Sequence, residues 1–251
     1  MAVLLTRPAP VNAASAARLR AAGFTVLPAP LMRFEAVACP DDADHSIDAT
    51  IVTSAAALRA IADHPMRTRL AAKPLFAVGE ATAAAAREAG FTKIAIASGD
   101  AASLCELILE TIRKRRLKKS TSFLYLAGAN LSCDLAEVLA PHGLHVATQT
   151  VYRMAALPTF PEAALAAFAA NGIEAVLHYS RRSAATFIEA ARLAGVEIAA
   201  LALPQCCISK AVADVLHEAG AQRIAVARTP DEPAMLEALT RTLRPDLNNA
   251  S

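Results

Sequence analysis

Small polar and basic side chains follow almost every predicted strand of this chain. In sheets of parallel strands, ligands bind at the carboxyl ends, where the first N–H groups of the next helix can bind anions. A single Ser, Thr or Asn at such a place more often caps its helix than binds a ligand, but the whole set favours a site for a large polyanionic molecule. The set is Thr6-Arg7-Pro8, Thr53-Ser54, Gly79-Glu80-Ala81-Thr82, Gly128-Ala129-Asn130, Tyr179-Ser180-Arg181-Arg182, Ser209-Lys210 and Arg228-Thr229-Pro230.

Several common catalytic motifs are missing from the sequence. It contains no GxGxxG and no Walker pattern, so nucleotide sites of those kinds have no support. It has no HExxH or comparable spacing for a metal, and Ser54 and Ser180 lack the GxSxG elbow of a serine hydrolase. His178 lies inside an apolar run, which favours a core histidine with satisfied hydrogen bonds over a catalytic one. The cysteines form no CxxC pair, and we expect buried thiols rather than disulfides.

A repeated pattern of elements would position these residues. Amphipathic alanine-rich stretches end in glycine and lead into a short apolar run, as in a helix that ends at a left-handed glycine before a buried strand. Such junctions predict mostly parallel sheets with helices on both faces. The glycines are Gly23, Gly90, Gly143, Gly195 and Gly220. The predicted strands are Val3–Thr6, Thr25–Leu31, Thr50–Thr53, Leu75–Val78, Lys93–Ala97, Phe123–Leu126, His145–Tyr152, Ala175–Tyr179, Ala202–Ile208 and Arg223–Ala227.

The sequence also repeats on a larger scale, which predicts two similar lobes, each with a five-stranded, mostly parallel sheet. The block from Val3 resembles the block from Phe123, and two further blocks match in the same order. Two equivalent segments, 31–37 and 150–156, extend beyond their strands, and we expect them to pair as a two-stranded hinge. Lobe one would then be discontinuous, with residues 1–33 and 155–251, and lobe two would hold residues 36–150. The lobes would face each other across a cleft.

Composition and charge restrict the remaining classes of function. The formal net charge is +2, so no strong field would draw the chain to nucleic acid or to a membrane. The basic run 114–119 ends a predicted amphipathic helix and has no interleaved aromatics, which favours a solvated helix end over a nucleic-acid surface. No apolar stretch approaches the roughly 20 residues of a membrane span, and residues 1–10 lack a charged leader followed by a long apolar run. We therefore expect a cytoplasmic protein. A monomer is a separate expectation, which these signals do not address.

The order of the short motifs resembles that of the uroporphyrinogen-III synthase family from Val3 to Leu243. Each motif is weak alone, and it is their order and spacing that carry the resemblance. They are Leu5-Thr6-Arg7-Pro8, Pro30-Leu31-Met32-Arg33-Phe34, Thr53-Ser54-Ala55, Ala77-Val78-Gly79-Glu80-Ala81-Thr82-Ala83, Val151-Tyr152-Arg153 and Tyr179-Ser180.

This resemblance implies a lyase of tetrapyrrole biosynthesis, the route to heme, siroheme and cobalamin. It would close hydroxymethylbilane to uroporphyrinogen III with inversion of ring D and loss of water, and without a cofactor. Tyr152 is implied as a hydrogen-bond donor or general acid at the departing hydroxyl, although a hinge tyrosine that only packs is an equal alternative. The implied substrate-binding residues are Thr6, Arg7, Ser54, Thr82, Ser180, Arg181, Ser209 and Lys210.

Two departures from the family pattern affect the site. Where many members carry arginines in an RGxxGR motif, this chain has Ala127 and Ser132, so an arginine clamp is absent there. Where many have threonines early in the last repeat, this chain reads Ser209-Lys210, and Ser209 would substitute. The main alternative is a two-lobed protein that closes on an anionic ligand without chemistry. A third hypothesis is a nucleic-acid-binding or regulatory module, which would require the basic run 114–119 to be the binding surface.

Overall fold

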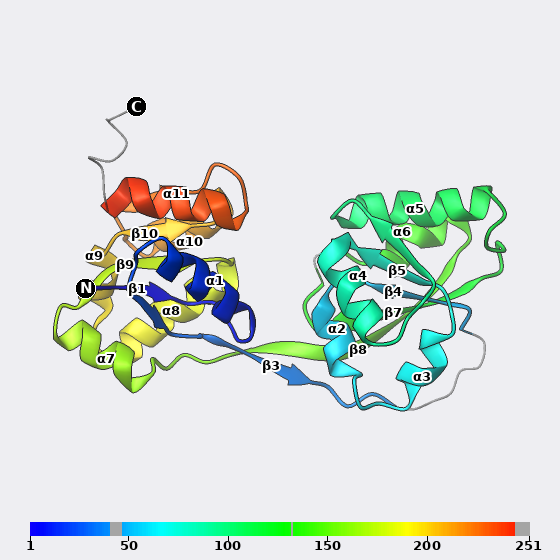
Figure 1. Ribbon diagram of the computed structural model, residues 1–251, viewed down its shortest axis with the longest axis horizontal. Coiled ribbons are helices and arrows are strands. Elements are labelled where there is room, and N and C mark those ends of the chain that lie inside the picture. Colours follow the sequence, from blue (N-terminus) through cyan, green and yellow to red (C-terminus); the bar gives the residue numbers. More distant parts are fainter. Residues whose placement is uncertain (41–46, 132, 244–251) are drawn as a thin grey trace. The chain divides into compact units, whose positions relative to one another are not determined.

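The computed structural model describes residues 1–40, 47–131 and 133–243, and the chain divides into two compact units. Unit 1 consists of Met1–Arg33 and Ala155–Ser251, and unit 2 of Phe34–Met154. Each unit holds one sheet with helices on both of its faces (Figure 1). Every strand pair whose register is defined runs parallel. The predicted α/β class, with two mostly parallel sheets flanked by helices, is therefore confirmed.

The sheet of unit 1 has five strands in the order β11-β10-β9-β1-β2. Because the chain leaves β1 toward one edge and leaves β9 toward the other, the strand order reverses between these two neighbours. Ligand sites of open α/β sheets lie at the carboxyl ends beside such a reversal. The elements are β1 (Ala2–Leu5), α1 (Val11–Ala21), β2 (Val26–Pro28), α7 (Glu162–Ala169), β9 (Ile173–His178), α8 (Arg181–Leu193), α9 (Glu197–Ala202), β10 (Gln205–Cys207), α10 (Lys210–Glu218), β11 (Ile224–Val226) and α11 (Glu232–Leu243).

Alternate side chains of β1 enter two separate cores of unit 1. Val3 and Leu5 are fully buried against α1 and α11, whereas Leu4 is buried on the other face against α8 and α10. The apolar run of β1 thus reflects a strand that is covered on both sides, as in other parallel sheets.

The sheet of unit 2 has six strands in the order β3-β8-β7-β4-β5-β6, one more than predicted. The additional strand is β3 from the segment expected to be hinge, which adds to the edge beside the long β8. Here the strand order reverses between β4 and β7. The elements are β3 (Met32–Ala36), β4 (Ala49–Val52), α2 (Ala55–Ala60), α3 (Met66–Ala71), β5 (Leu75–Val78), α4 (Gly79–Glu88), β6 (Ile94–Ala97), α5 (Ala101–Arg113), β7 (Ser122–Gly128), α6 (Leu135–Leu139), the short 3₁₀ helix η1 (Ala140–His142) and β8 (His145–Ala156).

Helices also cover both faces of the unit 2 sheet. Leu58 of α2 and Ala83 of α4 are buried on one face, while Leu104 and Ile108 of α5 are buried on the other. The N-terminus of α5 is fixed by Asp100, whose side chain accepts a bond from the Ser103 N–H in a capping box.

The segments 31–37 and 150–156 lie side by side. Strands β3 and β8 are neighbours in the sheet order. The Val37 N–H donates to the Val151 carbonyl at 2.8 Å, and the Leu157 N–H donates to the Leu31 carbonyl at 2.8 Å. Within unit 2, Arg153 forms an ion pair with Glu35. These segments pair as strands; their action as a hinge stays a prediction.

Helix ends follow the sequence pattern closely. All five glycines predicted to end helices have φ between 69° and 99°. Residues with a Cβ rarely adopt this left-handed conformation, so glycine is favoured there. In the part of the chain that the structure describes, no helix has the length and apolarity needed to cross a bilayer.

Candidate functional site

The carboxyl edge of the unit 2 sheet places Tyr152 among aromatic and small residues. Tyr152 lies on β8, is half-buried, and packs against the core beside Val151. Its ring stacks on Phe34 of β3, with centroids 5.9 Å apart and planes at 22°. Its carbonyl accepts a bond from the Ala129 N–H at 2.8 Å. Gly128 of β7 lies opposite Tyr152 in the register, so the phenol group lies against the end of the neighbouring strand.

A guanidinium lies beside this aromatic pair. The Cζ atom of Arg59, in the last turn of α2, is 3.8 Å from the centroid of the Phe34 ring. A stacked guanidinium keeps its in-plane N–H groups available for a carboxylate. The distance from the Arg59 Cζ atom to the centre of the Tyr152 ring cannot exceed the two centroid distances combined, so one large ligand can contact both side chains.

The other predicted residues of unit 2 lie at the ends of β4 and β5. Ser54 is the N-cap of α2, and its hydroxyl accepts a bond from the Ala56 N–H at 3.2 Å. Thr82 lies in the first turn of α4 and is buried. Next to Ser54, the Thr53 hydroxyl and the Tyr125 hydroxyl are 3.0 Å apart. Burial raises the pKa of Tyr125, so its phenol stays neutral and can donate.

In unit 1, the ends of β9 and β10 carry exposed polar groups. Ser180 caps α8, where its hydroxyl accepts a bond from the Ser183 N–H at 3.1 Å. Arg181, the first residue of α8, is exposed. Ser209 occupies the N-cap of α10 and makes no side-chain capping bond, whereas Lys210 pairs with Asp214 at 2.8 Å. The Ser209 hydroxyl, which makes no capping bond, and the exposed Arg181 cation are therefore both able to contact an anion at this edge.

The structure gives Thr6 and Arg7 strong internal contacts. Thr6 is fully buried, and its hydroxyl donates to the Leu177 carbonyl at 2.8 Å, so it joins β1 to β9. Arg7 forms an ion pair with Glu232 at the start of α11. The roles of Thr6 and Arg7 in substrate binding stay predictions, but the Thr6 hydroxyl and Nη1 of Arg7 already have partners within unit 1.

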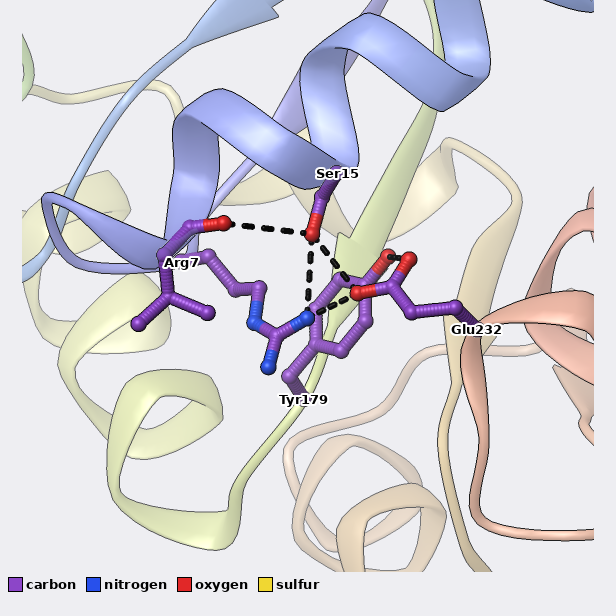
Figure 2. A network of polar contacts seen from close by, with 5 residues as sticks. Arg7, Ser15, Tyr179 and Glu232 are labelled. Atoms are coloured by element: carbon purple, nitrogen blue, oxygen red, sulfur yellow. Dashed lines mark hydrogen bonds and ion pairs between the residues drawn. The ribbon is translucent and has the colours of Figure 1, made fainter. Parts of the chain in front are cut away.

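Figure 2 shows the network around Arg7, where the strand order of unit 1 reverses. Arg7 Nη1 lies 3.0 Å from Ser15 Oγ, and this hydroxyl donates to Glu232 Oε1 at 2.6 Å. The guanidinium also lies over the Tyr179 ring, 4.3 Å from its centroid. The Tyr179 hydroxyl donates to Glu232 Oε2 at 3.3 Å. Burial, and then the Glu232 charge, raises the pKa of Tyr179, so its phenol remains a donor.

His178 is a core residue, as the sequence favoured, but within the described part of the chain only one of its two ring nitrogens has the expected hydrogen bond. It is fully buried, and Nε2 lies 2.8 Å from Oε1 of Gln205. Because the Gln205 amide nitrogen donates to the Ala200 and Leu203 carbonyls, Oε1 must accept, so the proton of the neutral imidazole is on Nε2. Nδ1 has no hydrogen-bond partner among the described residues. Burial lowers the pKa of His178 to about 4, so the ring is neutral near pH 7.

The residues of these clusters that sequence reasoning missed include Glu232, Arg59 and, as a partner of Tyr152, Phe34. Phe34 stands in a motif that the resemblance used, but its stacking depends on the pairing of β3 with β8. Glu232 follows the last predicted strand end by a few residues, and only its position as the acidic first residue of a helix hinted at a role. Ala127 is fully buried, and Ser132 lies outside the described residues.

Comparison with known proteins identifies the family. A family model described as uroporphyrinogen-III synthase HemD matches residues 13–237, which is most of the chain. The chain belongs to the uroporphyrinogen-III synthase family. Members of this family cyclise hydroxymethylbilane in tetrapyrrole and heme biosynthesis. No curated protein matches the chain in a sequence search.

Solved structures of uroporphyrinogen-III synthases share the fold. The enzyme from Helicobacter pylori is 20% identical with a TM-score of 0.63, and the match covers 97% of this chain and 99% of that one. A mutant enzyme from the extremely thermophilic bacterium Thermus thermophilus is also 20% identical, with a TM-score of 0.57 and coverage of 98% and 100%. At this identity the similarity establishes the α/β fold, and the roles of individual residues need their own arguments.

Proposed function

We propose that this chain closes hydroxymethylbilane to uroporphyrinogen III with ring D inverted, and that Tyr152 assists loss of the hydroxyl group. The observation that carries the role of Tyr152 is its environment. The ring is half-buried, stacked on Phe34, and lies with its phenol end at the carboxyl edge of the sheet. A donor held in this way can meet a leaving group without first reorganising.

The chemistry requires a donor more than a strong acid. The substrate hydroxyl leaves as water when the phenol of Tyr152 transfers its proton to it as the C–O bond breaks, and a cationic azafulvene remains. The phenol of a tyrosine is a hydrogen-bond donor, so Tyr152 has a proton to offer the leaving group. The substituted carbon of the terminal ring then attacks the azafulvene to give a spiro intermediate. The original bond from that carbon to the chain breaks, the ring recloses inverted through its unsubstituted carbon, and this carbon releases the proton that restores the tyrosine.

Charged and polar groups at the strand ends would hold the carboxylates of the substrate. In unit 2 the candidates are Arg59, whose N–H edge is available beside Phe34, and Ser54 and Thr82 at helix starts. In unit 1 we propose the group formed by Ser180, Arg181, Ser209 and Lys210. Thr6 and Arg7 are weaker candidates because the Thr6 hydroxyl and Nη1 of Arg7 bond within the unit. We further propose that the protein acts as a monomer in the cytoplasm.

Supplying hydroxymethylbilane and separating the product isomers tests the activity. The wild-type chain should give the type III isomer faster than the spontaneous reaction gives type I. Tyr152→Phe keeps the ring and its stacking but removes the donor, and we expect a rate loss on the order of 100-fold. Only type I product at the spontaneous rate would refute the activity, whereas a Tyr152→Phe enzyme with full rate and unchanged isomer ratio would refute the donor role alone.

A further inference from the structure

We propose that Gly128 is a positioning residue for Tyr152, because its missing side chain leaves the space that the phenol end of Tyr152 occupies. This inference rests on the proposed role of Tyr152 as the donor to the departing hydroxyl. It explains why the Tyr152 hydroxyl lies in one place, and it assigns this positioning to Gly128 on the neighbouring strand β7.

The close approach is specific to one side chain. A Cβ placed on Gly128 would lie 2.7 Å from Cζ of Tyr152, 2.9 Å from its hydroxyl oxygen and 3.1 Å from Cε2. These three atoms are the nearest neighbours of that position, and all belong to the far end of the Tyr152 ring. Non-bonded carbon atoms prefer about 3.5–4.0 Å, so a methyl group and the phenol cannot both occupy this space.

The backbone does not require glycine at this position. Gly128 is absent from the glycines with positive φ, so its conformation is one that alanine also adopts. The hydrogen-bonded ladder between β7 and β8 would likewise be unaffected by a methyl group, since it uses only main-chain atoms. The absence of a side chain at Gly128 therefore serves the approach of Tyr152.

A bulge in β8 brings the ring to this place. Ala127 pairs with Thr150, but the next residue, Gly128, pairs with Tyr152, so Val151 is an additional residue in β8. As a result, the consecutive side chains of Val151 and Tyr152 both pack against the same core. Bulges commonly redirect a side chain in this way. Phe34 then stacks on the ring and restricts where it can move.

The effect of Gly128→Ala depends on which atoms move to make room for the added methyl group. In Gly128→Ala, the flexible end of a half-buried tyrosine can shift, whereas the paired strands stay in place. The atom that moves most is the hydroxyl oxygen, the one that the reaction uses. A displacement of about 1 Å at a catalytic group can cost on the order of 100-fold in rate. The variant should therefore lose turnover and keep its fold.

Steady-state kinetics, product isomer analysis and thermal unfolding of five proteins test this proposal. They are the wild type, Gly128→Ala, Tyr152→Phe, the double variant, and Gly172→Ala as the matched control. Gly172 also lacks a positive φ, and a Cβ there would meet its nearest atom at an ordinary 3.5 Å. We expect Gly128→Ala to lose kcat by about 10- to 100-fold, with KM and the unfolding midpoint close to those of Gly172→Ala. The double variant should be no slower than Tyr152→Phe.

The outcomes separate this inference from the proposed function. If Tyr152→Phe is slow but Gly128→Ala turns over like the wild type, the positioning role is overturned and the donor role stands. An equal further loss of rate from Gly128→Ala in the Tyr152→Phe background would also overturn it, because Gly128 would then act independently. If Gly128→Ala fails to fold, the test is whether removal of the Tyr152 ring restores folding. The double variant Gly128→Ala/Tyr152→Ala should then be as stable as Tyr152→Ala, and a double variant that is less stable than Tyr152→Ala refutes the proposal.

Discussion

Glu232→Gln tests whether the network in Figure 2 stabilises unit 1. The substitution keeps the shape of the side chain but removes the charge that pairs with Arg7. The side chains of Arg7 and Glu232 are only 25% and 19% exposed, so the pair is intermediate between surface and core. Exposed ion pairs contribute about 0–1 kcal/mol, and removing one partner of a buried pair costs about 3–5 kcal/mol. We expect a loss of about 2 kcal/mol, which for a unit of this size lowers the unfolding midpoint by roughly 8 °C.

The measurement must resolve the two units, because a chain with two compact units need not unfold in one step. Hydrogen exchange followed by mass spectrometry gives this resolution through peptides from different elements. Peptides from α11 and β1 should exchange faster in Glu232→Gln, while peptides from unit 2 remain unchanged. Asp214→Asn is the matched control, since it removes an ion pair with Lys210 whose side chains are 84% and 51% exposed.

A double-mutant cycle with Arg7→Met isolates the pair itself. Each single variant should destabilise unit 1, and the double variant should lose less than the two losses added together. The reasoning is refuted if Glu232→Gln costs no more than Asp214→Asn, or if the two losses are strictly additive. In either case the ion pair would contribute little to stability, and the predicted binding of a substrate carboxylate by Arg7 would be supported.

Two further predictions concern acid stability and substrate binding. The pKa of His178 is about 4 in the folded chain and about 6.5 when unfolded, so the unfolded state binds more protons between these values. The free energy of unfolding of unit 1 should therefore decrease by up to about 3 kcal/mol as the pH falls through this window. Urea titrations at several pH values measure this decrease, and His178→Leu should abolish it. A wild-type stability that is flat from pH 7 to pH 4 would contradict this. Arg59→Met should raise KM for hydroxymethylbilane about 10-fold with kcat nearly unchanged, because a carboxylate contact worth about 1.4 kcal/mol is lost. Arg87→Met, which affects an exposed pair with Glu80, is the control, and equal KM values in the two variants would refute the role of Arg59.

The sequence determined the α/β class because its signals are local. A glycine that ends a helix must adopt positive φ, and Gly90 and Gly220 do so at 94° and 99°. Apolar runs such as β1 report strands that are covered on both faces. Polar residues after strands report helix starts, which is why Ser54 and Ser180 are caps as well as candidate ligands. Each of these inferences needs only a few neighbouring residues.

Contacts between distant segments were decided by the tertiary structure alone. No local pattern shows that Arg7 meets Glu232, 225 positions away, or that Phe34 stacks on Tyr152. The sixth strand of the second sheet likewise depends on which edge β8 leaves open for β3. The resemblance of the sequence to the synthase family named Tyr152, but only the register shift between β7 and β8 places its phenol against Gly128, because a bulge is defined by the pairing of two strands rather than by either strand alone.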